Sequence, residues 1–213
     1  MYLLHITGLS KTYYSAKGLE VVFEDYQKQF KTNRVCLTGK NGSGKSTLLL
    51  MIAGLVTHDS GQFLFADSNN APTYLSDKER VSSIALASDS LVFPSFLTAH
   101  EILNVNNKMW AKAWPNDLIE QFEFMPHLQK NVSSLSAGNL KKLQLIYAFM
   151  RQPSILLLDE PNLALDSRSV NALWDNIEQF KGMVICASNE PDLYVKNGFA
   201  VVPLRDVSNA ISA

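Results

Sequence analysis

One segment of the sequence combines glycines, a lysine and two hydroxyl residues in a spacing that can bind phosphate. It reads Gly39-Lys40-Asn41-Gly42-Ser43-Gly44-Lys45-Ser46-Thr47, a complete P-loop. Glycines let the backbone curl so that N–H groups point at phosphate oxygens, and the next helix adds its positive N-terminal end. We expect Lys45 to bridge the β- and γ-phosphates and Ser46 to ligate Mg²⁺. The predicted nucleotide contacts are Gly39, Asn41, Gly42, Ser43, Gly44, Lys45, Ser46 and Thr47.

Two acidic residues follow an apolar run later in the chain. Ile155-Leu156-Leu157-Leu158 is typical of a strand covered on both faces. Asp159 and Glu160 come directly after it, where we expect Asp159 in the Mg²⁺ shell and Glu160 beside the attacking water. A P-loop by itself is common to kinases, GTPases, motors and transporters, so other motifs must choose among them.

Two motifs flank this acidic pair. Leu135-Ser136-Ala137-Gly138-Asn139 opens a helical stretch upstream, and Asn162-Leu163-Ala164-Leu165-Asp166 follows downstream. A serine at a helix start is by itself only a cap. In this order the motifs resemble the signature sequence and the D-loop of the ABC ATPase family. The resemblance covers nearly the whole chain, with ordinary spacing.

The resemblance implies a head-to-tail dimer that holds ATP and Mg²⁺ in its interface. The P-loop of one subunit and Ser136, Gly138 and Asn139 of the other would grip each ATP. The second ATPase subunit would be an identical copy or a paralogue, and the dimer would drive a separate transmembrane permease subunit. Tyr13 resembles the aromatic residue that stacks on adenine, with Tyr14 as a rival for that role.

Three positions depart from the family pattern. Asp89 stands near the expected place of the glutamine that contacts Mg²⁺ and the attacking water, and Asn139 shortens the signature glutamine. Asn189 stands where the family has a switch histidine. Asparagine donates a hydrogen bond but does not titrate near neutrality. We therefore predict slow hydrolysis with Glu160 and Asn189 as catalytic residues, and a metal site of Ser46, Asp89 and Asp159.

The elements that position these residues alternate between strands and helices. We expect an antiparallel edge layer at residues 2–6 and 19–23, and further strands at 35–38, 62–66, 83–87, 155–158 and 183–187. We expect helices at 45–53, 98 onward, 117–124, 140–150 and 170–180. The fold class is α/β: a P-loop NTPase parallel-sheet core, an antiparallel β layer and a helical subdomain at about 98–151, within one domain at 1–213.

The composition excludes several classes of partner and location. The net charge of −1 leaves no basic field, so no nucleic acid is expected as a partner. Lys141-Lys142 is expected on a solvated helix face, and Cys36 and Cys186 as buried thiols in a reducing cytosol. No run approaches the roughly 20 apolar residues that span a bilayer. We expect a cytoplasmic protein, peripheral on the inner face of the membrane through its permease partner.

Two other functions fit the same motifs. A catalytically weak, nucleotide-gated regulatory subunit would explain Asp89 and Asn189. A soluble non-transport ABC protein would act on DNA or ribosomes, but the chain lacks a long coiled coil or a second ATP-binding half. Residues 89–97, with Phe93, Pro94 and Phe96, are the expected contact with a permease, and the aromatic residues among them have internal packing as an alternative role.

Overall fold

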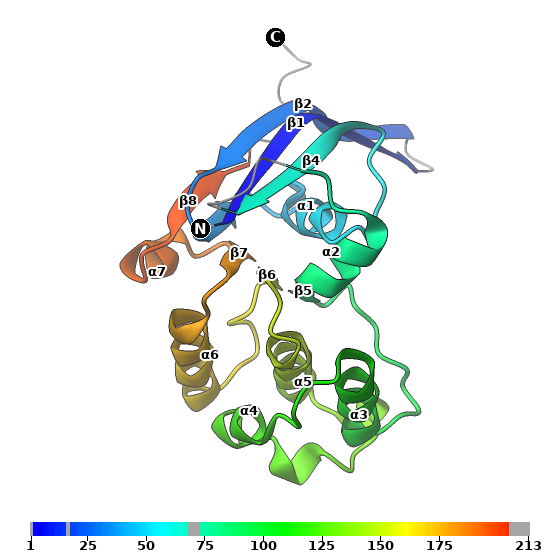
Figure 1. The fold of residues 1–213 in the computed structure, drawn as a ribbon, viewed down its shortest axis with the longest axis vertical. Helices are drawn as coiled ribbons and strands as arrows, with labels where there is room; N and C mark the ends of the chain where they lie inside the picture. Colours follow the sequence, from blue (N-terminus) through cyan, green and yellow to red (C-terminus); the bar gives the residue numbers. More distant parts are fainter. Residues whose placement is uncertain (1, 16–17, 68–72, 205–213) are drawn as a thin grey trace.

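A five-stranded parallel sheet carries the P-loop at the end of one of its inner strands (Figure 1). The structure is a computed structural model that describes residues 2–15, 18–67 and 73–204. The strand order is β5-β6-β7-β3-β8, and every neighbouring pair is parallel. The strands are β3 Arg34–Thr38, β5 Ile84–Ala87, β6 Ile155–Asp159, β7 Met183–Ala187 and β8 Ala200–Pro203. Because parallel strands end at one edge, the residues that follow β3, β6 and β7 meet there.

A three-stranded antiparallel sheet lies on one side of this core (Figure 1). Its order is β2-β1-β4, formed by β1 Tyr2–Ser15, β2 Gly18–Phe30 and β4 Ser60–Asp67. The predicted edge layer is therefore confirmed, with strands longer than the apolar alternation indicated. Register shifts in β1 after Ile6 and Leu9 interrupt that alternation, which explains why the sequence pattern ends early.

The helices fall on both faces of the parallel sheet. Helix α1 lies between the two sheets, while α5 and α6 lie on the opposite side of the parallel sheet and α3 and α4 pack against α5 (Figure 1). Their bounds are α1 Lys45–Ile52, α2 Asp77–Ser83, α3 Ala99–Trp110, α4 Asn116–Gln121, α5 Ala137–Met150, α6 Ser167–Gln179 and α7 Pro191–Lys196, with short 3₁₀ turns at Met125–His127 and Val132–Ser134. The predicted capping box at Thr98 is confirmed, since its hydroxyl accepts from the Glu101 N–H. No helix in the described ranges has the length and apolar content needed to cross a bilayer.

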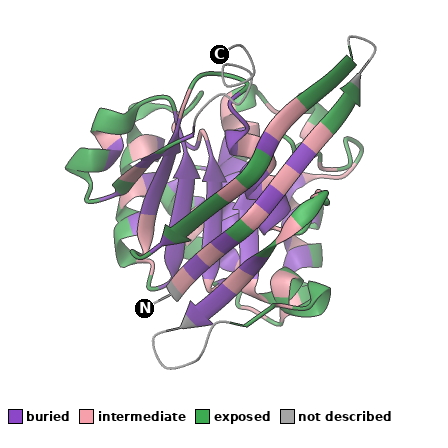
Figure 2. Cartoon of the chain, turned by 90° about the horizontal axis from the view of Figure 1, so that it is seen from above, coloured by how far each residue is buried: buried purple, intermediate pink, exposed green. Residues whose placement is uncertain are grey.

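The core consists of two apolar clusters separated by the parallel sheet. On β3, Val35 and Leu37 pack toward α1 and the antiparallel sheet, while Cys36 packs toward the helices on the other face. This alternation is the period-two pattern of a strand buried on both sides. Figure 2 shows the inner part of the parallel sheet buried almost throughout, whereas the antiparallel strands mix buried and exposed residues. The parallel edge strand β8 is also partly exposed.

The two cysteines occupy facing positions in this core. Cys36 on β3 and Cys186 on β7 are partners in the strand register, and both are free thiols without exposed surface. The expectation of buried thiols is confirmed. Their separation in the sequence concealed that they are neighbours, because adjacent strands of a parallel sheet come from distant parts of the chain.

Candidate nucleotide-binding site

The P-loop has the backbone shape that a phosphate requires. Gly44 adopts the left-handed region with φ +88°, and a Cβ atom there would lie 2.6 Å from Val22 Cγ1. No other residue type combines that φ with so little space. The Ser43 N–H closes the turn on the Lys40 carbonyl at 3.1 Å. The Ser43 hydroxyl is buried and has no hydrogen-bond partner within the described residues. Buried polar groups normally have a partner, and a bound anion would supply one.

Lys45 is the first residue of α1 and directs its ammonium back into the loop. Its Nζ donates to Gly39 O at 2.7 Å, to Lys40 O at 3.2 Å and to Asn189 Oδ1 at 2.9 Å. The side chain is buried. All three acceptors are neutral oxygens, so the positive charge remains for an anionic ligand. This is the charge that the P-loop pattern predicts beside the terminal phosphates.

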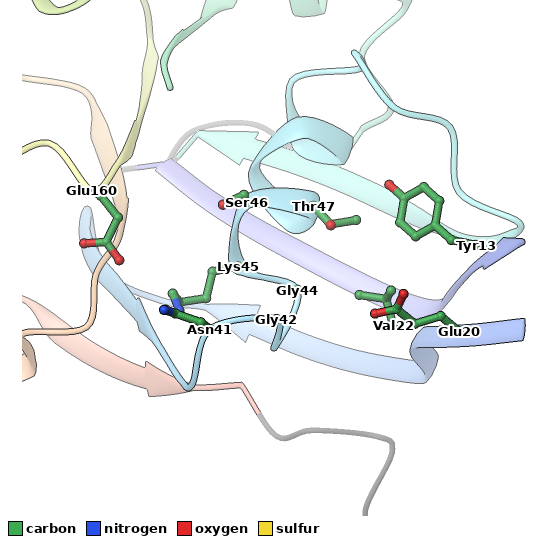
Figure 3. A pocket seen from close by; sticks show the side chains of 10 residues that line it. All are labelled: Tyr13, Glu20, Val22, Asn41, Gly42, Gly44, Lys45, Ser46, Thr47 and Glu160. Atoms are coloured by element: carbon green, nitrogen blue, oxygen red, sulfur yellow. The ribbon is translucent and has the colours of Figure 1, made fainter. Parts of the chain in front are cut away.

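An open pocket of about 500 Å³ runs along the loop. Figure 3 shows Tyr13 at one end and Glu160 at the other, with the P-loop between them. The lining residues are Tyr13, Glu20, Val22, Asn41, Gly42, Gly44, Lys45, Ser46, Thr47 and Glu160. Tyr13 is the tyrosine in this lining, whereas Tyr14 lies outside it with 85% of its surface exposed. The structure therefore places Tyr13, and not Tyr14, at this pocket.

The contribution of β2 to this pocket was not predicted. Glu20 and Val22 line it because β2 pairs with β1, where Tyr13 faces Glu20 in the register. The register shifts of β1 make that pairing impossible to count from sequence. Gly39 and Ser43 belong to the loop but are not among the lining residues.

The end of β6 offers an oxygen that fits a cation. Asp159 is buried, and its Oδ2 accepts from the Ser88 hydroxyl at 2.9 Å. Its Oδ1 is buried and has no partner among the described residues. A buried carboxylate oxygen without a donor is costly unless a ligand satisfies it. Asp159 is not among the pocket-lining residues, but its unpartnered oxygen and the Ser46 hydroxyl of the lining are the ligand type that Mg²⁺ prefers, so the residues present fit that ion.

Glu160 sits on a sharp turn directly after β6. Its φ is +43°, and its N–H donates to Ala187 O at 2.9 Å, which ties it to the end of β7. Partial burial raises the pKa of the Glu160 carboxyl above its ordinary value, while the Lys45 ammonium opposes that rise. A carboxylate with a raised pKa beside a phosphate-binding lysine is suited to accept a proton.

Asn189 follows β7 and bridges two parts of the P-loop. Its Oδ1 accepts from Lys45 Nζ, and its Nδ2 donates to Asn41 Oδ1 at 2.9 Å. A backbone hydrogen bond from Asn189 also acts on the Glu160 carboxyl and lowers its pKa. The structure thus brings the two predicted catalytic residues to the same lysine.

The signature segment lies outside this pocket. Ser136 caps α5, with its exposed hydroxyl accepting from the Asn139 N–H at 3.3 Å. A Cβ atom on Gly138 would lie 2.5 Å from Ala164 O in the D-loop, so only glycine allows that approach. Ser136, Gly138 and Asn139 do not line the pocket of their own chain.

The expectation that Lys141 and Lys142 lie on a solvated helix face is wrong. Their exposed fractions are 3% and 6%. Lys141 pairs with Asp89 at 2.8 Å, and Lys142 pairs with Asp166, the N-cap of α6, at 2.7 Å. The Lys142 ammonium holds the pKa of Asp166 well below its usual range. Long side chains on a helix that packs against loops on both flanks can be buried when each charge has a partner, which a short charge run does not reveal.

Asp89 differs from its expected surroundings. Its carboxylate contacts Lys141, and it is not among the residues that line the pocket with Ser46. Its neighbour Ser88 is the residue that contacts Asp159. Asp159 is likewise absent from that lining, so Ser46 is the one of the three predicted metal ligands that lines the pocket.

Comparison with known proteins places the chain in a family. A family model described as ABC transporter matches residues 28–163. A putative ABC transporter ATP-binding protein of Archaeoglobus fulgidus is 29% identical over 173 residues, which cover 78% of this chain and 72% of the relative. The doxorubicin resistance ATP-binding protein DrrA of Mycobacterium tuberculosis is 27% identical over 84% of this chain, which spans only 55% of that relative.

Solved structures share the fold. An ATP-binding subunit of an ABC transporter superposes with a TM-score of 0.80 at 23% identity, over 96% of this chain and 86% of the other. A dimeric ATP-binding cassette in a post-hydrolysis state, bound to ADP and Pi, gives a TM-score of 0.78 at 20% identity, over 95% and 94%. The family match, the relatives and the shared fold agree with the P-loop geometry: the chain belongs to the ABC transporter family and is one of its ATP-binding proteins.

Proposed function

We propose that this chain is the ATP-hydrolysing subunit of an ABC transporter, which dimerises on ATP and drives a separate transmembrane subunit. One observation carries the proposal. Tyr13, Lys45 and Glu160 line one pocket, while Ser136 of the signature segment stays exposed and outside it. The chain thus offers two half-sites that a second copy or a paralogue can complete.

ATP supplies the physical link between the two subunits. The start of α5 is a helix N-terminus, where exposed N–H groups and the helix dipole favour an anion. A γ-phosphate held by Lys45 of one subunit and by this segment of the other stabilises the closed dimer. Loss of that phosphate removes the shared ligand, which shifts the population toward the open state.

Hydrolysis is assigned to residues at the ends of β6 and β7. Glu160 accepts the proton of the attacking water, and Asn189 holds Lys45 and the Glu160 carboxyl in place. Ser46 and Asp159 would hold Mg²⁺, which would supply positive charge to neutralise the phosphates. Asp89, the third predicted metal ligand, is paired with Lys141 in the structure.

The amide at position 189 sets the rate in this proposal. Asn189→His restores a group that donates to phosphate and titrates near neutrality. We expect turnover to rise about tenfold, less than the roughly 10²–10⁴-fold of a full proton-transferring group, because asparagine already donates a hydrogen bond. Steady-state phosphate release at saturating Mg-ATP measures the change, with Asn197→His as a control on an exposed asparagine outside the pocket. A histidine variant slower than the wild type contradicts this role.

A permease partner has a surface on which to dock. Phe93 packs against Tyr147 with ring centroids 5.2 Å apart, but Val92 and Phe96 are largely exposed. Val105 and Met109 add exposed apolar surface on α3. Such residues are the type that a membrane subunit buries. Docking on a permease would hold the protein peripherally on the inner face of the membrane. In this proposal the chain is one domain over residues 1–213, with a helical subdomain at about 98–151.

Ser136→Asp tests the shared site. Aspartate caps a helix as well as serine does, so α5 should keep its fold. Its negative charge, however, stands where the partner's γ-phosphate would bind. We expect the wild type to sediment as a dimer with Mg-ATP and as a monomer without it, and Ser136→Asp to remain monomeric while ATP binding changes less than threefold. Ser136→Thr, a neutral cap, should dimerise.

The same measurements judge the alternatives. A wild type that dimerises on ATP without turnover supports a regulatory subunit instead. A chain that co-purifies with ribosomes rather than membranes supports a non-transport role. A Glu160→Gln variant that stays monomeric at saturating Mg-ATP, where the shared phosphate is not lost, overturns the proposal.

A further inference from the structure

A buried lysine on α5 joins three segments of the site. The Lys141 side chain is almost wholly buried, and its Nζ lies 2.8 Å from Asp89 Oδ1 and 3.4 Å from the backbone oxygen of Asp159. A buried ammonium is tolerated only when its charge and donors are satisfied. Asp89 lies just after β5 and Asp159 ends β6, so one side chain connects both strand ends to the helix that begins with the signature segment.

The residue before Asp89 completes this connection. Ser88 is buried, and its hydroxyl donates to Asp159 Oδ2 at 2.9 Å while accepting from the Ser90 N–H at 3.2 Å. These bonds mean that Oδ2 is the carboxylate oxygen of Asp159 that is hydrogen-bonded within the chain. Oδ1 is left buried and without a partner in the described part of the chain. The segment after β5 thus orients Asp159 in two ways, directly through Ser88 and indirectly through Asp89 and Lys141.

The charge balance explains why an aspartate is tolerated at position 89. An unpaired carboxylate would repel the triphosphate of a nucleotide bound nearby. The Lys141 ammonium takes up that charge at ion-pair distance. The side chain of Asp89 is 66% exposed and that of Lys141 is 3% exposed, so solvent reaches the carboxylate but hardly reaches the ammonium.

We propose that Lys141 is a positioning residue for ATP hydrolysis, which acts with Asp89 and Ser88 to orient Asp159 and the start of α5. In this arrangement Asp89 is a tether for the lysine and not a metal ligand. The inference rests on the proposed function, because it assigns roles in hydrolysis at that same site. It makes the metal carboxylate and the signature segment depend on one ion pair within the chain.

A double-mutant cycle tests the pair. We expect Lys141→Met and Asp89→Asn each to lower kcat about tenfold with the KM for ATP within twofold. The double variant should be no worse than either single one, because residues that act through one contact are not additive. Asp89→Glu, which keeps the charge on an exposed side chain, should stay within twofold of the wild type. Lys108→Met, on the exposed face of α3, is the control for loss of a lysine.

A binding measurement separates a tether from a metal ligand. Calorimetric titration of ATP at a series of Mg²⁺ concentrations should give an equally raised half-saturating Mg²⁺ for Asp89→Asn and Lys141→Met, because each variant loses the ion pair that orients Asp159. A higher requirement in Asp89→Asn alone makes Asp89 a metal ligand and overturns the inference. A kcat within twofold of the wild-type value in both single variants also overturns the inference.

Three further outcomes bear on the inference. Lys142→Met also removes a buried ion pair, the one with Asp166. If it lowers kcat and the melting temperature as much as Lys141→Met does, the effect is general destabilisation and the inference fails. If Lys141→Met does not fold, Asp89→Asn against Asp89→Glu decides alone. A wild type that binds Mg-ATP without turnover overturns the proposed function itself, whereas an active wild type with unaffected variants overturns this inference only.

Discussion

Lys45→Met is expected to weaken ATP binding by about tenfold to a hundredfold, which is the usual value of a hydrogen bond to a charged group. Lys45 carries the single cationic side chain among the ten residues that line the described pocket. Methionine fills similar space without the charge. The remaining contacts come from backbone N–H groups and hydroxyls, so binding should weaken without being abolished. Hydrolysis should fall further, by about a hundredfold or more, because the ammonium stabilises the charge that develops in the transition state more strongly than it stabilises bound ATP.

The measurement is calorimetric titration with Mg-ATP, together with phosphate release. Lys40→Met is the matched control, since it removes an exposed lysine from the same loop whose side chain does not line the pocket. Its ATP affinity should stay within threefold of the wild type. Equal losses in both variants would mean that general charge, and not the placement of Lys45, governs binding.

Glu160→Gln is expected to reduce turnover at least a hundredfold while Mg-ATP affinity stays within threefold. Glutamine keeps the shape and the hydrogen-bonding atoms but cannot accept the proton of the attacking water, and general bases contribute about 10²–10⁴ in rate. The ATP-bound dimer should then persist, because its shared phosphate is no longer lost. Glu190→Gln, an exposed carboxylate close enough to influence Glu160, is the control and should retain turnover.

The raised pKa of Glu160 leads to two further expectations, one for the pH dependence of turnover and one for the pH dependence of stability. Burial raises that pKa in the folded chain, so turnover of the wild type should decline as pH falls through a value above the ordinary glutamate range. The folded state also binds this proton more tightly than the unfolded state, so stability falls as pH rises between the two pKa values and stays lower above them. Glu160→Gln removes that cost, and its melting temperature without nucleotide should exceed that of the wild type at neutral pH. A lower melting temperature would contradict the raised pKa.

The short, irregular elements escaped prediction. β8 and α7 were missed, and so was α2 despite its capping box at Ser76 and Glu79. Each spans at most two helical turns or a few strand residues, which is too little for a hydrophobic period to stand out. The apolar strands β3, β6 and β7 were predicted because burial on both faces leaves a continuous apolar run.

Local chemistry could be predicted from the order of the residues alone. The P-loop, the acidic pair after β6 and the caps at Thr98 and Ser136 act through bonds within a few residues, so their types and spacing suffice to predict their geometry. The folded chain was needed to show that Tyr13 and not Tyr14 lines the pocket, and that Lys141 and Lys142 are buried partners of Asp89 and Asp166. The difference arises because strand register and ion pairs join segments that are far apart in the chain. A sequence pattern shows neither the distance between such segments nor the burial that makes an unpaired charge costly.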